Sequence, residues 1–135
     1  MDEALFRLVW QRANRCCEYC RLPQAYSALA FEVDHIIARK HGGPTAPGNL
    51  AMTCFYCNSY KGSNIAGIDP RSRKIVRLFH PRRHKWTRHF SWDGPTLIGR
   101  TPEGRATIAV LDLNGEDRVK LRQLLMREGI MPSAL

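Results

Sequence analysis

Asp34 and His35 stand side by side in an apolar run, FEVDHII, that leads into the charged and glycine-containing sequence ARKHGG. Burying a carboxylate or an imidazole without a partner is costly, so the pair needs a reason to be there. One explanation is a salt-bridged turn at the end of a strand. The other is a metal ligand beside a general base, because a carboxylate oxygen suits Mg²⁺ and histidine can deprotonate water near neutral pH.

The cysteines form a second group of residues with metal chemistry. Four of the five fall into two C-x-x-C pairs, Cys17/Cys20 and Cys54/Cys57. In a reducing compartment this spacing predicts a tetrahedral structural Zn²⁺ site, which four thiolates close completely. The fifth cysteine, Cys16, could replace Cys17, but the C-x-x-C spacing favours Cys17.

Two other zinc sites fit the sequence less well. A two-cysteine, two-histidine finger would use Cys17, Cys20, His35 and His41. That choice leaves Cys54 and Cys57 without a role. A zinc deaminase requires H-x-E, whereas Ile36 and Ile37 follow His35.

The charge of the chain is concentrated in one segment. The formal net charge is +9, and the stretch from Arg71 to His89 has eight Lys or Arg residues and no Asp or Glu. These cations are Arg71, Arg73, Lys74, Arg77, Arg82, Arg83, Lys85 and Arg88. A solvated basic face is the simplest interpretation, but the imbalance and the interleaved aromatic residues favour a nucleic-acid partner.

No part of the sequence predicts a membrane protein. No apolar run approaches the roughly 20 residues that cross a bilayer. The N-terminal segment, MDEALFRLVWQRANR, starts acidic and lacks the core of a signal peptide. We therefore expect a soluble, cytoplasmic protein with no membrane partner. Its length of 135 residues suits one domain.

The hydrophobic pattern predicts both helices and strands. A helix is expected over 2–14, two strands over 30–37 and 50–54 joined by a Gly- and Pro-rich loop, and a helix from residue 55 to Gly62 or Gly67. Beyond Gly67 we expect strands over 74–79 and 96–101 and helices over 104–113 and 116–128.

The order of these features resembles the HNH endonuclease family. EVDHI is followed by GG, NL and C-x-x-C-N-x-x-K-G, and the pattern covers residues 15–62. The resemblance implies an α+β fold with a ββα-metal (HNH, His-Me finger) core, here with an N-terminal helix and a C-terminal β/α extension. We expect the zinc-stapled core over residues 1–67. The basic extension over 68–135 is expected to pack on it rather than to fold independently.

The resemblance also implies roles for four residues. Asp34 takes the place of a ligand to the catalytic divalent ion, and His35 takes that of the general base. Asn49 matches the asparagine that steadies the histidine-bearing loop. Asn58 matches the last motif position, commonly histidine and often asparagine, and completes a site for Mg²⁺ or another ion such as Mn²⁺ or Ni²⁺.

The implied activity is metal-assisted hydrolysis of DNA phosphodiester bonds, and the residues would suit RNA as well. Basic residues near the motif and in the basic segment are expected to contact phosphates, namely Arg39, Lys40, Lys61, Arg82, Arg83 and Lys85. The alternative is a zinc-stabilised nucleic-acid-binding module without catalysis. Such a module needs the cysteines and the cations but gives no reason for Asp34, His35 and Asn58 together.

Overall fold

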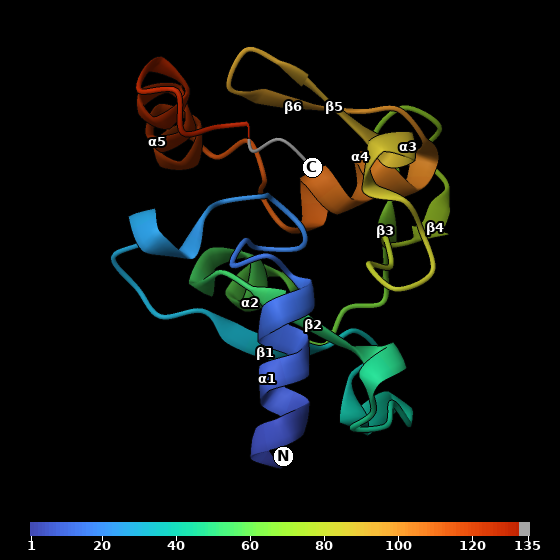
Figure 1. The fold of residues 1–135 in the computed structure, drawn as a ribbon. Helices are drawn as coiled ribbons and strands as arrows, with labels where there is room; N and C mark the ends of the chain where they lie inside the picture. The colour runs from blue at the N-terminus through green and yellow to red at the C-terminus, as the bar shows by residue number, and fades with distance from the viewer. Residues whose placement is uncertain (133–135) are drawn as a thin grey trace. The chain divides into compact units, whose positions relative to one another are not determined.

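The computed structural model describes residues 1–132 and divides the chain into two compact units (Figure 1). The first unit comprises residues 1–65 and 80–85, and the second comprises residues 66–79 and those from 86 onward. Each contains helices and small antiparallel sheets, so the expected α+β class is confirmed. The predicted division at residue 67, with the extension packed on the core, stays a prediction. Within residues 1–132, no helix is both long and apolar enough to cross a membrane.

The first unit opens with the expected N-terminal helix, α1 (Glu3–Arg12). Asp2 caps it by accepting a hydrogen bond from the backbone N–H of Leu5 at 2.7 Å. Val9 and Ala13 are buried on its inner side, whereas Leu8 is exposed. Only part of the apolar surface of this helix is therefore buried.

A hairpin and a short helix follow in the expected ββα order. Strand β1 (Glu32–His35) pairs antiparallel with β2 (Leu50–Thr53), and His35 lies opposite Leu50. All of β2 is buried. Helix α2 (Phe55–Lys61) starts directly after β2, capped by the Cys54 sulfur, which accepts from the Cys57 N–H at 3.4 Å. Three 3₁₀ turns, Gln24–Tyr26, Arg39–His41 and Pro47–Asn49, shape the connections.

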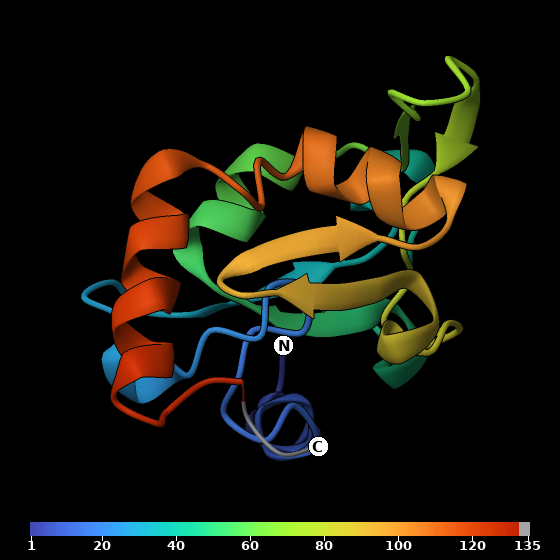
Figure 2. The same cartoon turned by 90° about the horizontal axis from the view of Figure 1, so that it is seen from above.

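The second unit combines two hairpins with three helices. The hairpins are β3 (Ala66–Ile68) with β4 (Ile75–Arg77) and β5 (Phe90–Asp93) with β6 (Thr96–Gly99). The helices are α3 (Trp86–His89), α4 (Pro102–Val110) and α5 (Glu116–Arg127). Helix α4 packs against β3, β4 and β6, and Figure 2 shows it beside the β5–β6 hairpin.

Three elements of this unit differ from the sequence-based expectation. The strands expected over 74–79 and 96–101 and the two helices are confirmed by β4, β6, α4 and α5. Strands β3 and β5 and helix α3 were not expected. Helix α3 is a single turn, and contacts distant in sequence support it: its Trp86 ring lies 5.2 Å from Phe90 and 5.8 Å from Trp92. Such short elements carry too few residues for a period to show.

Candidate functional site

The four paired cysteines meet in one buried cluster. Their sulfur atoms all lie within 4.8 Å of one another, and the Cys20 and Cys54 sulfurs are 3.8 Å apart. Tetrahedral zinc with Zn–S bonds of about 2.3 Å places thiolates about 3.8 Å apart. The residues present therefore fit a metal ion of this kind. The four-cysteine prediction is confirmed as a site positioned to hold a metal ion.

The geometry excludes two alternative ligand sets for this site, one with two histidines and one with Cys16 in place of Cys17. Among residues 1–132, no histidine joins the cysteine cluster, so the two-cysteine, two-histidine finger is wrong. Cys16 is also outside it, buried in an isolated β-bridge with Pro23. Burial raises the pKa of the Cys17 and Cys57 thiols, so protons and a metal ion compete for this site.

Asp34 lies on β1 in a buried ion pair with Lys61 of α2. The Asp34 Oδ2 and Lys61 Nζ atoms are 2.9 Å apart, and the side chains are only 6% and 1% exposed. Lys61 Nζ also donates to the backbone oxygen of His35 at 3.1 Å. Burial raises the pKa of Asp34, and the charge of Lys61 opposes that shift. Asp34 Oδ2 is inaccessible to solvent, and within residues 1–132 its contact with Lys61 is an ion pair rather than a well-aligned hydrogen bond.

Asn58 reaches the same strand from the same helix. Its Nδ2 donates to the carboxylate of Glu32. Asn58 and Lys61 are three residues apart on α2 and share one helix face. Glu32 and Asp34 are two residues apart on β1 and share one strand face. The two contacts therefore bring Asp34 and Asn58 to one contact between β1 and α2, with the Asn58 side-chain oxygen not used by Glu32.

His35 is the last residue of β1 and is half-buried. Its Nε2 lies 2.8 Å from the Thr45 hydroxyl oxygen. Because the strand ends here, the alternation that would send Asp34 and His35 to opposite faces stops at this point. The structure thus permits both side chains to serve one site.

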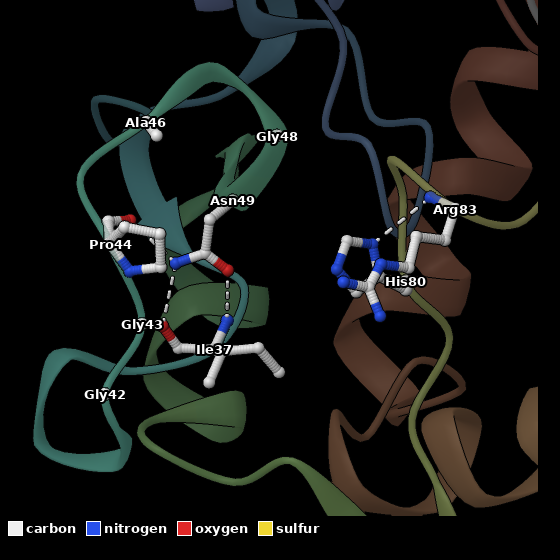
Figure 3. A pocket seen from close by; sticks show the side chains of 9 residues that line it. All are labelled: Ile37, Gly42, Gly43, Pro44, Ala46, Gly48, Asn49, His80 and Arg83. Atoms are coloured by element: carbon white, nitrogen blue, oxygen red, sulfur yellow. Dashed lines mark hydrogen bonds between the residues drawn. The ribbon is translucent and has the colours of Figure 1, made fainter.

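Asn49 fixes the loop that carries Thr45. Its Oδ1 accepts from the Ile37 N–H at 2.9 Å, and its Nδ2 donates to the carbonyls of Ile37 at 3.0 Å and Pro44 at 2.9 Å (Figure 3). Gly43 has no room for a side chain, because a Cβ there would lie 1.7 Å from the Ile37 oxygen. Asn49 is buried, so these three bonds hold the loop without competition from water.

A recess of about 410 Å³ lies between this loop and a turn that carries His80 and Arg83. Figure 3 shows these two side chains facing the loop from the opposite side of the recess. His80 Nδ1 accepts from the backbone N–H groups of Arg82 and Arg83, both at 3.2 Å. Burial, together with the charges of Arg83 and His84, lowers the pKa of His80 to about 4. His80 is therefore a neutral imidazole with its proton on Nε2.

The basic residues expected to contact phosphate fall into two groups. Arg39, Lys40, Arg83 and Lys85 are exposed. Lys61 is buried against Asp34, and Arg82 forms an ion pair with Glu18. Glu18 is itself buried and accepts from the Met52 N–H at 2.8 Å. Burial, then the charge of Arg12, lowers the pKa of Arg82 to about 10. Lys61 and Arg82 therefore place their charges inside the unit rather than at its surface.

Sequence reasoning missed three polar partners at this site, Glu32, Thr45 and Glu18. The two-residue spacing between Glu32 and Asp34 could have placed both on one strand face. Thr45 and Glu18 have no local pattern, because their partners His35 and Arg82 lie elsewhere in the chain.

Comparison with known proteins places these residues in a family motif. Residues 17–64 match the family model described as HNH endonuclease. The resemblance drawn from the sequence is thereby confirmed for this part of the chain, which includes both cysteine pairs. No curated protein and no solved structure matched the chain.

Proposed function

We propose that the HNH motif of residues 17–64 is the active site of a metal-dependent endonuclease that hydrolyses phosphodiester bonds in DNA. One observation carries the proposal. The strand that ends at His35 meets α2 through two polar contacts, Asp34 with Lys61 and Asn58 with Glu32. These contacts, and the hydrogen bond from Lys61 to the backbone oxygen of His35, join the three proposed site residues to the contact between β1 and α2, within the segment that matches a nuclease family model.

In this proposal Asp34 and Asn58 hold a divalent ion such as Mg²⁺, Mn²⁺ or Ni²⁺. One carboxylate and one amide oxygen suit a hard ion that keeps several waters. When bound, the ion offsets negative charge on the phosphate and the departing oxygen. Lys61 favours the ionised form of Asp34 and fixes its carboxylate, in place of the phosphate contact expected of Lys61 from the sequence.

His35 acts as the general base. In the tautomer whose Nε2–H donates to Thr45, Nδ1 has a free lone pair and can take a proton from water. Asn49 has a positioning role, because it holds the loop on which Thr45 lies. The exposed cations Arg39, Lys40, Arg83 and Lys85 bind backbone phosphates of the substrate.

The four-cysteine cluster holds a structural Zn²⁺ in this account. It joins the turn at Cys17 and Cys20 to the start of α2, which carries Asn58 and Lys61. Among residues 1–132 no cysteine forms a disulfide, which agrees with a metal site in a reducing compartment.

A zinc-stabilised nucleic-acid-binding module without catalysis is the second candidate. The ion pair between Asp34 and Lys61 favours it, because a purely structural pair would also be buried and charge-balanced.

Plasmid nicking separates the two candidates. Supercoiled plasmid is incubated with the full chain and Mg²⁺, Mn²⁺ or Ni²⁺, with and without EDTA, beside His35→Ala and the control His41→Ala, an exposed histidine of the same loop. We expect metal-dependent nicking that His35→Ala reduces by about 100-fold or more and His41→Ala retains. Equal rates for the His35→Ala protein would remove the catalytic assignment. Plasmid binding without nicking in any metal would favour the second candidate.

A further inference from the structure

The β3–β4 hairpin of the second unit has two different faces. Its inner face packs on α4, so closely at Gly67 that a Cβ there would lie 2.4 Å from a Val110 methyl carbon. Its outer face carries Ile68 and Ile75, which lie opposite each other in the ladder. They are 54% and 77% exposed. A cross-strand pair of β-branched apolar side chains therefore faces solvent.

The outer face and the tip of the hairpin carry only positive charge. Arg71, Arg73, Lys74 and Arg77 are all exposed, and none forms an ion pair within residues 1–132. The only acid between residues 66 and 77 is Asp69, which is fully buried. The four cations are therefore not balanced at the surface of the hairpin.

Asp69 also gives the tip a defined shape. Arg105 binds it with two parallel hydrogen bonds, of 2.8 Å and 2.9 Å, and these lower the pKa of the carboxyl. The same carboxylate accepts from the backbone N–H groups of Arg71 at 3.0 Å and Ser72 at 3.3 Å. The tip is thus tied to α4 and presents its cations in a fixed arrangement.

From these observations we propose that the β3–β4 hairpin is a DNA-binding ribbon that enters the major groove of a duplex. Its charges complement the phosphates that border the groove, and its isoleucine pair suits apolar contact with thymine methyl groups. The major groove is about 12 Å wide and admits a two-stranded ribbon, whose strands lie about 4.8 Å apart. The hairpin lies outside the residues matched to the nuclease family, and it rests on the proposed function only for the choice of DNA.

The deep, narrow major groove of an RNA duplex does not admit side chains in this way. The geometry therefore favours duplex DNA over duplex RNA. A membrane surface would need a larger apolar area than two isoleucines with cations around them.

Binding of a 20-base-pair DNA duplex at several salt concentrations tests the proposal. All proteins are full-length and carry His35→Ala, so that cleavage is slowed by about 100-fold or more during the binding measurement. The test variant is Arg71→Gln/Arg77→Gln, and the matched control, Lys120→Gln/Arg127→Gln, removes two exposed charges from α5. A third variant, Ile75→Ser, removes apolar area without changing charge.

We expect the hairpin variant to weaken binding and to reduce the slope of log K against log salt by about 1.8, or about 0.9 for each lost phosphate contact. The α5 control should leave affinity and slope near those of the parent protein. Ile75→Ser should weaken binding by about tenfold at an unchanged slope, because it removes an uncharged contact. Equal unfolding midpoints would show that all variants are folded.

Four results would overturn the proposal: no duplex binding by the parent protein, equal losses in the hairpin and α5 variants, equal hairpin-dependent binding of duplex RNA, or hairpin-dependent binding of phosphatidylserine vesicles with DNA binding unaffected. Since His35 is absent from every protein compared, the outcome does not depend on cleavage. A failed nicking assay would leave this result standing, and the reverse also holds.

Discussion

The ammonium of Lys61 lies 2.9 Å from the Asp34 carboxylate, in a place where neither side chain is more than 6% exposed. Lysine and aspartate are almost never buried to this degree unless they are paired. Asp34 directly precedes His35 in the sequence, and Lys61 Nζ also donates a hydrogen bond to the backbone oxygen of His35. The ion pair therefore fixes the main chain and the carboxylate of the proposed active site together.

Replacing Lys61 by methionine should leave the Asp34 charge buried without a partner. We expect Lys61→Met to destabilise the protein by about 3 kcal/mol, because breaking a buried pair on one side is strongly unfavourable. The double variant Asp34→Asn/Lys61→Met should lose less than the sum of the two single variants. Urea unfolding of the four proteins measures this coupling, and additive losses would contradict it.

Metal content tests the cysteine cluster. The purified protein should hold one tightly bound Zn²⁺ per chain, measured by mass spectrometry of the metals. Cys54→Ser should lose the ion and unfold at lower temperature, since the ion ties two segments of the unit together. Cys16→Ser is the matched control, because Cys16 is also buried but lies outside the cluster. A folded parent protein without metal would refute the zinc staple.

The pKa of His80 predicts a dependence of stability on pH. Unfolded histidine takes up a proton near pH 6.5, whereas folded His80 does so only near pH 4. The unfolded state therefore binds more protons between these values, and the contribution of His80 to stability is full above pH 6.5 and falls towards pH 4. As the pH falls from 6.5 to 4, the unfolding free energy of the parent protein should therefore decrease relative to that of His80→Asn. A constant difference, or a His80 NMR titration near pH 6.5, would contradict the prediction.

Much of the first unit follows from local sequence pattern. The sequence predicts a helix over 2–14, observed as Glu3–Arg12, together with the hairpin and the cysteine cluster, because their periods and spacings are short-range. The burial of Lys61 was not, because Lys61 is read as a surface cation unless its place opposite Asp34 is known. Asn58 and Lys61 are three residues apart and therefore share a helix face, which is a weak indication in the sequence that both contact β1.

The second unit was predicted less completely for a physical reason. Its short strands and single-turn helix are stabilised by contacts between distant residues, such as Asp69 with Arg105. The side chain of Asp69 is fully buried, and the residues next to it in the sequence give no indication of that burial. The basic character of residues 71–77 was visible in the sequence, but its placement on one exposed hairpin required the ladder of β3 and β4.

Paramagnetic broadening by Mn²⁺ tests the central claim most directly, because it reports where a divalent ion sits without requiring cleavage. With the cysteine cluster loaded with Zn²⁺, added Mn²⁺ should broaden the NMR signals of Asp34, His35 and Asn58 first, and excess Mg²⁺ should reverse the effect. Asp34→Asn should weaken the broadening at all three positions. Broadening that spares these residues, or that is unchanged in Asp34→Asn, would contradict the account.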